Sequence, residues 1–572
     1  MKLSLKSASS SFNIFIAVWL LVNLLQAGFT NLNNDEAYYW MYSRQLDWGY
    51  FDHPPMIALM MKIGYSLFQN ELGARLMTVA LMAGTLAIIW RMVDNESKNN
   101  ESIPYFIMLA VILPAFNLFG FIATPDSPLM FFSALFLLSY KRFLEKEDWK
   151  SVAIMCFSMA AMMYSKYHAA LLLVFVILSN MRLLLKPKFI IASAGALVLY
   201  APHLLWQVRN EFPTFRYHLV DRVAGLNPSY VFEYIGNLLV FQNPVILPLA
   251  IWLIFKIKIK DKFERALVFI MYGFIFFFLI ESLRYRVQPQ WTALMSLPVI
   301  IFMFNALRNH PGIKKTILLT AYVMIPVMVV GRLALAIDFL PVKFFKEEYH
   351  DYKKKMRELS AIAGDLPVVF TNSYQDPSIY TFYTGKFAHS LNDLYYRKTQ
   401  YDLWDFEERI HGERVLYAPQ WPAQYFEGHF RKHFFFNGDS LYVNEYASFR
   451  SLTKEFVILD EPQYLFNEDC INQISFLLFN PYPYPVEIKN EEFPVSFHLG
   501  FFRNGKIESY TGLSIPDSIS TIGVGDTIAV ECRFNLDILP GDNYKVAVCC
   551  ATGILFNTCN SRLSEAVIRK KR

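Results

Sequence analysis

Acidic and aromatic residues gather in two short stretches near the start of the chain. Residues 34–40 read Asn-Asp-Glu-Ala-Tyr-Tyr-Trp, and residues 49–55 read Gly-Tyr-Phe-Asp-His-Pro-Pro. A carboxylate can take a proton from an incoming hydroxyl group, and so Asp35 and Glu36 are candidate catalytic residues. Their neighbours in the two stretches are candidates for substrate binding, namely Tyr39, Tyr50, Asp52 and His53.

A second set of charged residues lies further along the chain, at the ends of apolar stretches. Asp126, in Thr124–Pro128, adds another candidate catalytic acid. Lys166, Arg284 and Arg286 are candidate substrate-binding residues, because cations can hold a leaving phosphate and stabilise its growing charge. Acids and cations of this kind fit the transfer of a group from a lipid phosphate.

Each of these residues also has a simpler interpretation. Asp35 could cap a helix at the membrane interface, and Asp126 could cap an apolar helix whose first turn contains a proline. Lys166 could extend its side chain towards the interface, and His53 could be a turn residue before two prolines. The two arginines could contact phospholipid headgroups. The shared location of the set on one side of a membrane favours a common site.

The elements that must position these residues are apolar helices. The chain has 572 residues, of which 54% are hydrophobic and 18% charged, and about 20 apolar residues are needed for a helix to cross a bilayer. We therefore predict about eleven transmembrane helices. They lie near residues 11–29, 73–91, 104–122, 127–144, 151–165, 168–185, 189–206, 232–255, 265–281, 291–307 and 316–338.

Lys and Arg are concentrated in alternate loops, such as 141–150 and 256–265. Basic loops stay on the cytoplasmic side, so the N-terminus is expected inside, and the Asp35 loop and everything after Leu340 outside. The first apolar stretch could instead be a signal peptide, but no small-residue cleavage site follows it, which favours a retained helix. The net charge of +5 is then largely a topology signal, and no basic–aromatic stripe indicates nucleic-acid binding.

We predict three domains: a transmembrane domain over residues 1–340, an extracytoplasmic α/β domain over 341–460, and a β-rich domain over 461–572. The α/β prediction rests on a charged amphipathic helix at 349–363, a strand at 367–370 and a helix at 376–383. Alternating runs such as Val495-Ser496-Phe497-His498-Leu499 predict a small β-sandwich in the last domain. Five cysteines fall in the outer part, and their pairing cannot be deduced from the sequence.

The motifs resemble those of polyprenyl-phosphate-dependent GT-C glycosyltransferases, in the group of families 39 and 83. That group includes the protein O-mannosyltransferases, the ArnT-type lipid A aminoarabinose transferases and the RgtA to RgtD type. The resemblance rests on Asp35-Glu36 with Tyr39, on Tyr50–Pro55, and on Ala123–Leu129. Residues 202–210 and 373–383 are similar to motifs of the bacterial members, and the resemblance covers about residues 1–400.

The resemblance implies an integral membrane enzyme that takes a sugar from a polyprenyl phosphate, here undecaprenyl phosphate, with inversion at the anomeric carbon. Asp35 matches the acid assigned to catalysis, Glu36 and Tyr39 match its neighbours, and Asp126 matches a second acid near the pocket. The aminoarabinose transferases have Glu-Lys before the two prolines, where this chain has Asp52-His53. Because histidine is a weaker, pH-dependent cation, this departure leaves the phosphate contact and the donor sugar open.

We therefore expect a multi-pass glycosyltransferase of a bacterial inner membrane that acts on its extracytoplasmic face. Its expected partners are the lipid-linked donor, a lipid or protein acceptor such as lipid A, and the bilayer, without nucleic acid. No cofactor is implied, and no metal, although the acids and His53 could bind a divalent ion. The alternatives are a secondary transporter, which would show charges inside spans and broken, repeated helices, and an envelope-assembly protein without transferase activity.

Overall fold

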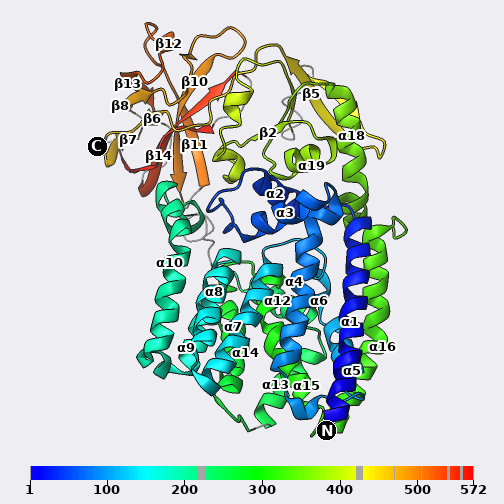
Figure 1. The fold of residues 1–572 in the computed structure, drawn as a ribbon. Coiled ribbons are helices and arrows are strands. Elements are labelled where there is room, and N and C mark those ends of the chain that lie inside the picture. The colour runs from blue at the N-terminus through cyan, green and yellow to red at the C-terminus, as the bar shows by residue number, and fades with distance from the viewer. Residues whose placement is uncertain are drawn as a thin grey trace. The chain divides into compact units, whose positions relative to one another are not determined.

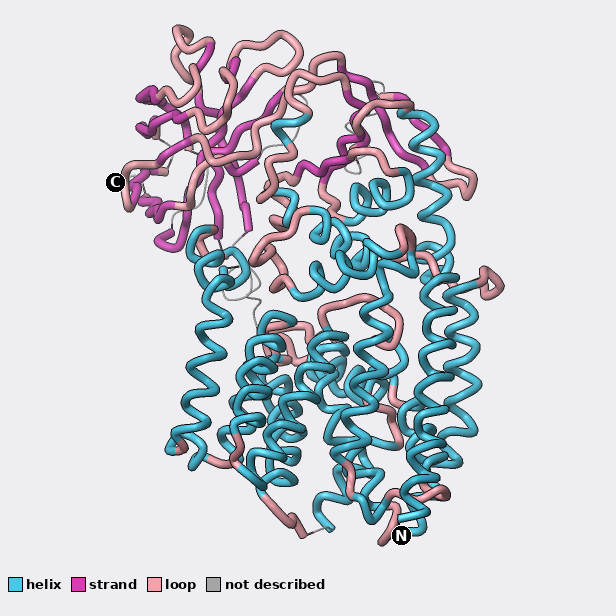
Figure 2. Tube along the Cα trace, in the orientation of Figure 1, coloured by secondary structure: helices cyan, strands magenta, loops and turns pink. Residues whose placement is uncertain are grey.

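The structure is a computed structural model of the 572-residue chain. It describes residues 2–216, 226–256, 258–419, 430–468, 470–503, 506–536, 541–553 and 558–570. The chain folds into two compact units, Met1–Asp351 and Tyr352–Arg572. Figure 2 shows that helices make up the first unit, whereas the described strands all belong to the second.

The first unit is a bundle of helices in which all eleven predicted apolar stretches are largely helical (Figure 1). The α-helices are α1 Lys2–Phe29, α2 Asn34–Arg44, α3 Met56–Leu67, α4 Glu71–Met92, α5 Ile103–Ile112, α6 Pro114–Leu118, α7 Asp126–Lys146, α8 Trp149–Ser165, α9 Ala169–Ser179, α10 Pro187–Arg209, α11 Pro213–Arg216, α12 Ser229–Phe241, α13 Ile246–Lys256, α14 Lys262–Glu281, α15 Ser296–Ala306, α16 Pro311–Ala336 and α17 Lys343–Phe345. Short 3₁₀-helices cover Asn95–Ser97, Met181–Leu185 and Pro289–Met295, and a π-helix, η5, covers Lys346–Asp351.

Five of the described helices are long and apolar enough to cross a membrane by themselves, namely α1, α4, α10, α14 and α16, and six spans result if α12 and α13 count as one. The remaining predicted stretches form shorter, broken or more polar helices, so the predicted count of eleven is not established. One prediction is wrong in detail, because residues 232–255 are not a straight helix. They are bent by 89° between α12 and α13.

The bend has a local cause in the sequence. Asn243 adopts a left-handed backbone with φ of 71°, and its side-chain oxygen accepts hydrogen bonds from the backbone N–H groups of Val245 and Ile246. Pro244 follows directly, and proline disfavours a helical conformation in the residue before it. These residues therefore end α12 and start α13 in a new direction.

Helices α2 and α3 lie across one end of the bundle, beside the end of α1 and the start of α4 (Figure 1). Helix α3 is a short apolar helix over Met56–Leu67. Its exposed apolar side chains are Leu59, Ile63 and Leu67, and their spacing of four residues places them on one face of the helix. This apolar face suits a helix that lies along a membrane surface.

The second unit combines an α/β sheet with a β-sandwich. The first sheet has the order β2-β1-β3-β5-β4, in which β1 is parallel to β2 and β3, and β5 is antiparallel to β3 and β4. Its elements are α18 Tyr352–Ala363, β1 Val368–Thr371, α19 Gln375–Thr384, β2 Ala388–Leu391, β3 Val415–Ala418, β4 Arg431–Phe434 and β5 Ser440–Tyr446, with 3₁₀-helices at Gln400–Asp402 and Glu407–Arg409.

The sandwich is built from a six-stranded sheet in the order β11-β10-β14-β16-β7, with β15 paired to β14, and a three-stranded sheet in the order β13-β8-β6. Alternate residues of both sheets, such as Phe501 of β10 and Phe534 of β13, point into one shared hydrophobic core. The strands are β6 Val457–Ile458, β7 Gln463–Asn467, β8 Ile471–Phe479, β9 Val486–Glu487, β10 Val495–Arg503, β11 Lys506–Leu513, β12 Thr521–Ile522, β13 Thr527–Asn535, β14 Gly541–Thr552, β15 Thr558–Cys559 and β16 Ser564–Arg569.

Candidate active site

Helix α2, which carries the first acidic motif, begins with a capping box. The side chain of Asn33 accepts a hydrogen bond from the N–H of Glu36 at 2.9 Å, and the carboxylate of Glu36 accepts one from the N–H of Asn33 at 3.1 Å. Asn33 is therefore the N-cap, and the alternative interpretation of Asp35 as the cap is wrong. Asp35 lies in the first turn with its side chain exposed.

Glu36 is buried in a charged cluster below α2. Its carboxylate pairs with the guanidinium of Arg75 on α4 through contacts of 2.5 and 2.6 Å, and both side chains are fully buried. The same carboxylate accepts a hydrogen bond from the N–H of Ala123 at 2.7 Å. Arg75 also donates to the carbonyls of Ala27 and Thr30 at the end of α1. These bonds occupy the Glu36 carboxylate and hold the loop in place, and the catalytic role of Glu36 stays a prediction.

The bond to Ala123 brings the second acidic motif next to the first. Asp126 begins α7 three residues later, and its carboxylate accepts hydrogen bonds from the Lys166 ammonium at 2.8 and 2.9 Å. Lys166 follows the last residue of α8, and the Asp126 and Lys166 side chains are only 4% and 7% exposed. Two residues that were predicted separately, an acid and a phosphate contact, are thus one buried ion pair.

A third acid, which the sequence did not single out, lies beside Asp35. Glu348 is in η5, and both of its carboxylate oxygens accept hydrogen bonds from the side chain of Asn34 at 3.0 and 3.1 Å. Asn31 donates to the carbonyl of Tyr349 at 2.6 Å. Burial raises the pKa of Glu348, and the negative charge of Asp35 raises it further. In the sequence, the position of Glu348 soon after the last apolar stretch could have indicated that it lies at the same end of the bundle as the first acidic motif.

The aromatic residues of α2 hold the second half of the loop. Tyr38 and Tyr42 lie one turn apart, and their hydroxyls donate to Asp52 at 3.0 and 3.4 Å. The hydroxyl of Tyr39 lies 3.2 Å from Nε2 of His53. The predicted binding residues Tyr39, Asp52 and His53 are therefore brought together by one face of a short helix.

Tyr50 lies in the interior of the same loop. Its ring is fully buried and stacks on Tyr42 at 4.1 Å between ring centres. Its hydroxyl donates to the carbonyls of Tyr42 and Gln45 and accepts from the N–H of Asp47. The Tyr50 hydroxyl is thus bonded to the loop's own backbone and shapes the loop, and its role in substrate binding stays a prediction.

The end of α10 supports the same loop, which gives a physical reason for the motif noted at residues 202–210. The Trp206 indole donates to the side chain of Asp47 at 2.7 Å, and Nδ1 of His203 lies 2.7 Å from the carbonyl of Trp48. The Trp206 ring packs so closely on Gly49 that a Cβ there would be 2.4 Å from it. Only glycine fits this approach without displacing the ring.

The two predicted arginines lie on the loop after α14, and both are exposed. Arg286 pairs with Glu233 of α12 at 2.7 Å, with side chains 71% and 34% exposed. Surface pairs of this kind contribute little to stability. Among the described residues, no cluster of three or more His, Cys, Asp or Glu side chains is placed to hold a metal ion.

The fold is that of the GT-C glycosyltransferases: a multipass helical membrane unit with acids on a short helix across its end. ArnT from Cupriavidus metallidurans in the apo state superposes with a TM-score of 0.55 and 14% identity, over 76% of this chain and 98% of that one. The same enzyme bound to undecaprenyl phosphate gives 0.55 and 15% over the same shares. Because the sequence identity with these structures is so low, the similarity shows a shared fold and carries no conclusion about substrates.

Sequence comparisons agree with the fold. Residues 52–206 match the family described as Dolichyl-phosphate-mannose-protein mannosyltransferase. Lipid A galacturonosyltransferase RgtD of Rhizobium johnstonii is 24% identical over 294 residues, which are 48% of this chain and 60% of that protein. Lipopolysaccharide core galacturonosyltransferase RgtA of the same organism is 26% identical over 249 residues, which are 41% of this chain and 49% of that protein. The chain thus spans about half the length of the curated relatives it matches, and the resemblance to GT-C glycosyltransferases is confirmed.

Proposed function

We propose that this protein is a membrane glycosyltransferase that moves a sugar from a polyprenyl phosphate to an envelope glycolipid. The GT-C fold supports a lipid-linked donor, because a structural neighbour is ArnT bound to undecaprenyl phosphate. The similarity to enzymes named for lipid A and lipopolysaccharide core supports a glycolipid acceptor. The same relatives are galacturonosyltransferases, which makes a galacturonosyl or related sugar the first donor to test.

The observation that carries this proposal is the contrast between Asp35 and its neighbour. Glu36 is locked by Arg75 and Ala123, whereas Asp35 projects from the same helical turn with its side chain exposed. An accessible carboxylate on a rigidly held turn can accept the proton of an acceptor hydroxyl as that hydroxyl attacks the anomeric carbon. When the hydroxyl attacks the face of the anomeric carbon opposite to the departing lipid phosphate, the configuration at that carbon is inverted.

The remaining site residues have supporting roles in this proposal. The Asp126–Lys166 pair lies next to the Glu36 framework and supports it without adding net charge. His53, beside Tyr39, and the exposed Arg284 and Arg286 are the proposed contacts for the donor phosphate. We place the enzyme in a bacterial inner membrane with its N-terminus in the cytoplasm and the second unit outside, as the basic loops indicate.

The test is transfer by the purified full-length protein in lipid nanodiscs. Undecaprenyl phosphate carrying a radiolabelled sugar is the donor, and lipid A or a model protein is the acceptor. We expect label on the lipid A, and Asp35→Asn should abolish it. The matched control is Asp94→Asn, since Asp94 lies in the loop after α4 and forms an exposed pair with Lys260.

Three results would reject this function. Label on the protein acceptor alone would exclude the glycolipid acceptor. The transporter alternative is tested with the protein in sealed lipid vesicles. Movement of a solute across their bilayer without donor, together with no sugar release from any labelled donor, would favour a transporter. Absence of both activities with every donor sugar would favour the envelope-assembly interpretation.

A further inference from the structure

Two cysteines face each other across adjacent strands of the β-sandwich. Cys549 of β14 and Cys559 of β15 are register partners. The N–H of Asn560 donates to the carbonyl of Val548 at 3.1 Å. Since hydrogen-bonded and non-hydrogen-bonded pairs alternate along an antiparallel ladder, the cysteines are a non-hydrogen-bonded pair. The Cα atoms of such a pair lie about 4.5 Å apart, within the roughly 4.4–6.8 Å that a disulfide spans.

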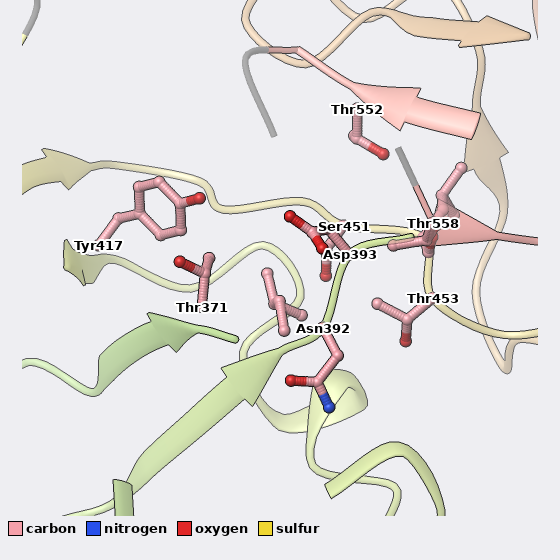
Figure 3. A pocket seen from close by; sticks show the side chains of 10 residues that line it. Thr371, Asn392, Asp393, Tyr417, Ser451, Thr453, Thr552 and Thr558 are labelled. Atoms are coloured by element: carbon pink, nitrogen blue, oxygen red, sulfur yellow. The ribbon is translucent and has the colours of Figure 1, made fainter. Parts of the chain in front are cut away.

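Cys559 is held in this position from the other side of its strand. The side chains of its two neighbours, Thr558 and Asn560, both donate to the carbonyl of Leu452, at 2.6 and 3.0 Å. Figure 3 shows Thr558 on that side, where it lines a pocket together with Leu452. Because successive side chains of a strand point to opposite faces, Cys559 is turned away from this pocket and towards Cys549.

Small residues keep space open around the two sulfur atoms. Gly500 of β10 and Ala547 of β14 are register partners, and a Cβ at Gly500 would lie only 3.1 Å from Sγ of Cys549. Cys549, Ala547 and Phe502 form a small apolar cluster, and Cys559 packs against it. The two thiols therefore share one apolar compartment, on the face of the sheet that points away from the sandwich core.

The other cysteines of the second unit lie elsewhere. Cys550 belongs to the sandwich core, on the opposite face of β14 from Cys549. Cys532 of β13 lies in the same core, and Cys470 lies directly before β8. In the ladders of the described strands, Cys549 and Cys559 are the one pair of cysteines in register. The fold thus selects one pairing, which the sequence alone left open.

The two thiols differ in the way that an exchange reaction requires. Cys559 is partly exposed, whereas Cys549 is buried. The hydrogen bond from Cys549 lowers the pKa of the Cys559 thiol, and the charge of Lys398 acts in the same direction. The same hydrogen bond, together with burial, raises the pKa of Cys549. Because the thiolate is the nucleophile in disulfide exchange, Cys559 is the thiol suited to attack first.

We propose that Cys549 and Cys559 form a reversible disulfide that fastens β15 to β14. The Cys559 thiolate attacks one sulfur of a low-molecular-weight disulfide, such as oxidised glutathione, and releases one thiol. Cys549 then loses its proton and displaces the second thiol from the mixed disulfide. The cysteine pair thereby loses two electrons and two protons, and the small disulfide takes them up as two thiols. None of the residues proposed for sugar transfer takes part.

The test uses the full-length protein in nanodiscs and needs neither donor nor acceptor, so it stands whether or not transfer is detected. The protein is treated with oxidised glutathione, denatured and labelled with a maleimide, and the labels are counted by intact mass. The six cysteines should take up six labels before oxidation, four after it, and six again after dithiothreitol. Six labels after oxidation would refute the disulfide.

Variants identify the two sulfur atoms. Cys559→Ser should keep its remaining thiols reactive and acquire no glutathione, because Cys549 is buried. Cys549→Ala should acquire one lasting glutathione on Cys559, because the attack still occurs and no thiol displaces the adduct. The matched controls are Cys550→Ala, which removes the adjacent cysteine on the opposite face of β14, and Cys470→Ser, which removes another partly exposed thiol.

Both controls should still lose two reactive thiols on oxidation. Two results would overturn the proposed pair. One is a glutathione adduct that persists on the wild-type protein, since the second thiol would then fail to displace it. The other is a disulfide that forms in Cys549→Ala and is lost in Cys550→Ala, since the partner of Cys559 would then be Cys550.

The bond should also stabilise the sandwich, and Cys532 reports this within the intact protein. Its side chain is buried in the sandwich core, so a maleimide reaches it when the sandwich opens. On heating, labelling of Cys532 should begin about 5 °C higher in the oxidised protein than in the reduced one, because the closed loop restricts the unfolded chain. Cys559→Ser should show no such difference. Equal temperatures for both forms of the wild type would refute the fastening of β15.

Discussion

The roles assigned to Asp35 and Glu36 can be separated by two isosteric substitutions in adjacent residues. Asp35→Asn removes a carboxylate from an exposed side chain that takes no part in the capping box. Glu36→Gln removes the counter-charge of Arg75, whose side chain is fully buried. The first change should act on the reaction and the second on the fold.

The magnitudes follow from these environments. A general base contributes roughly 10²–10⁴-fold in rate, so Asp35→Asn should lower kcat by that factor and leave thermal stability unchanged. Removing one partner from a buried ion pair costs about 3–5 kcal/mol, because the other charge stays buried without compensation. Glu36→Gln also weakens the bond from Ala123 that joins the two acidic motifs, and so it should destabilise the first unit by about this amount.

The assay pairs turnover with stability on the same samples. Transfer from labelled undecaprenyl-phosphate sugar gives the rate, and fluorescence-detected size exclusion after heating gives the stability of each variant in detergent. Wild-type turnover by Asp35→Asn would remove Asp35 from the chemistry. Full stability of Glu36→Gln together with a lost rate would contradict the positioning role and return Glu36 to the catalytic residues.

Three further outcomes are expected. The negative charges of Glu348 and Asp35 repel each other, and Glu348→Gln removes this repulsion, so the acidic limb of the pH–rate profile should shift to lower pH. An unshifted limb would mean that the charge of Glu348 does not act on the acid that limits the rate. Asp126→Asn and Lys166→Gln should each lower the melting temperature, and the double variant should lose less than the sum of the two; additive losses would mean that the pair is not coupled. If His53 holds the donor phosphate as a cation, His53→Lys should keep donor binding at high pH while His53→Gln weakens it, as filter binding of labelled donor would show; normal binding by His53→Gln would move the phosphate contact elsewhere.

The helices were the part of the fold that the sequence predicted well, because twenty consecutive apolar residues leave few alternatives to a helix in lipid. The broken span at Asn243 and Pro244 was visible as a dipeptide, but hydropathy averaged over a window hides a single break. The alternation along Val495–Leu499, which lies in β10, likewise predicted a sandwich, and β8 and β13 alternate in the same way. Their pairing, and the parallel pairing of β7 with β16 across about a hundred residues, depends on tertiary packing that no local pattern carries.

The site was predictable in its composition and not in its division of roles. Asp35 and Glu36 are chemically similar neighbours, so nothing local distinguishes them. Their difference arises because successive residues of a helix point about 100° apart, which turns Glu36 towards the bundle and leaves Asp35 outside. Arg75, 39 residues further along the chain, then fills the buried position with a counter-charge. In the proposed mechanism the two acids depend on each other, because the buried Glu36–Arg75 pair fixes the helical turn and the exposed Asp35 carboxylate then meets the substrate in one orientation.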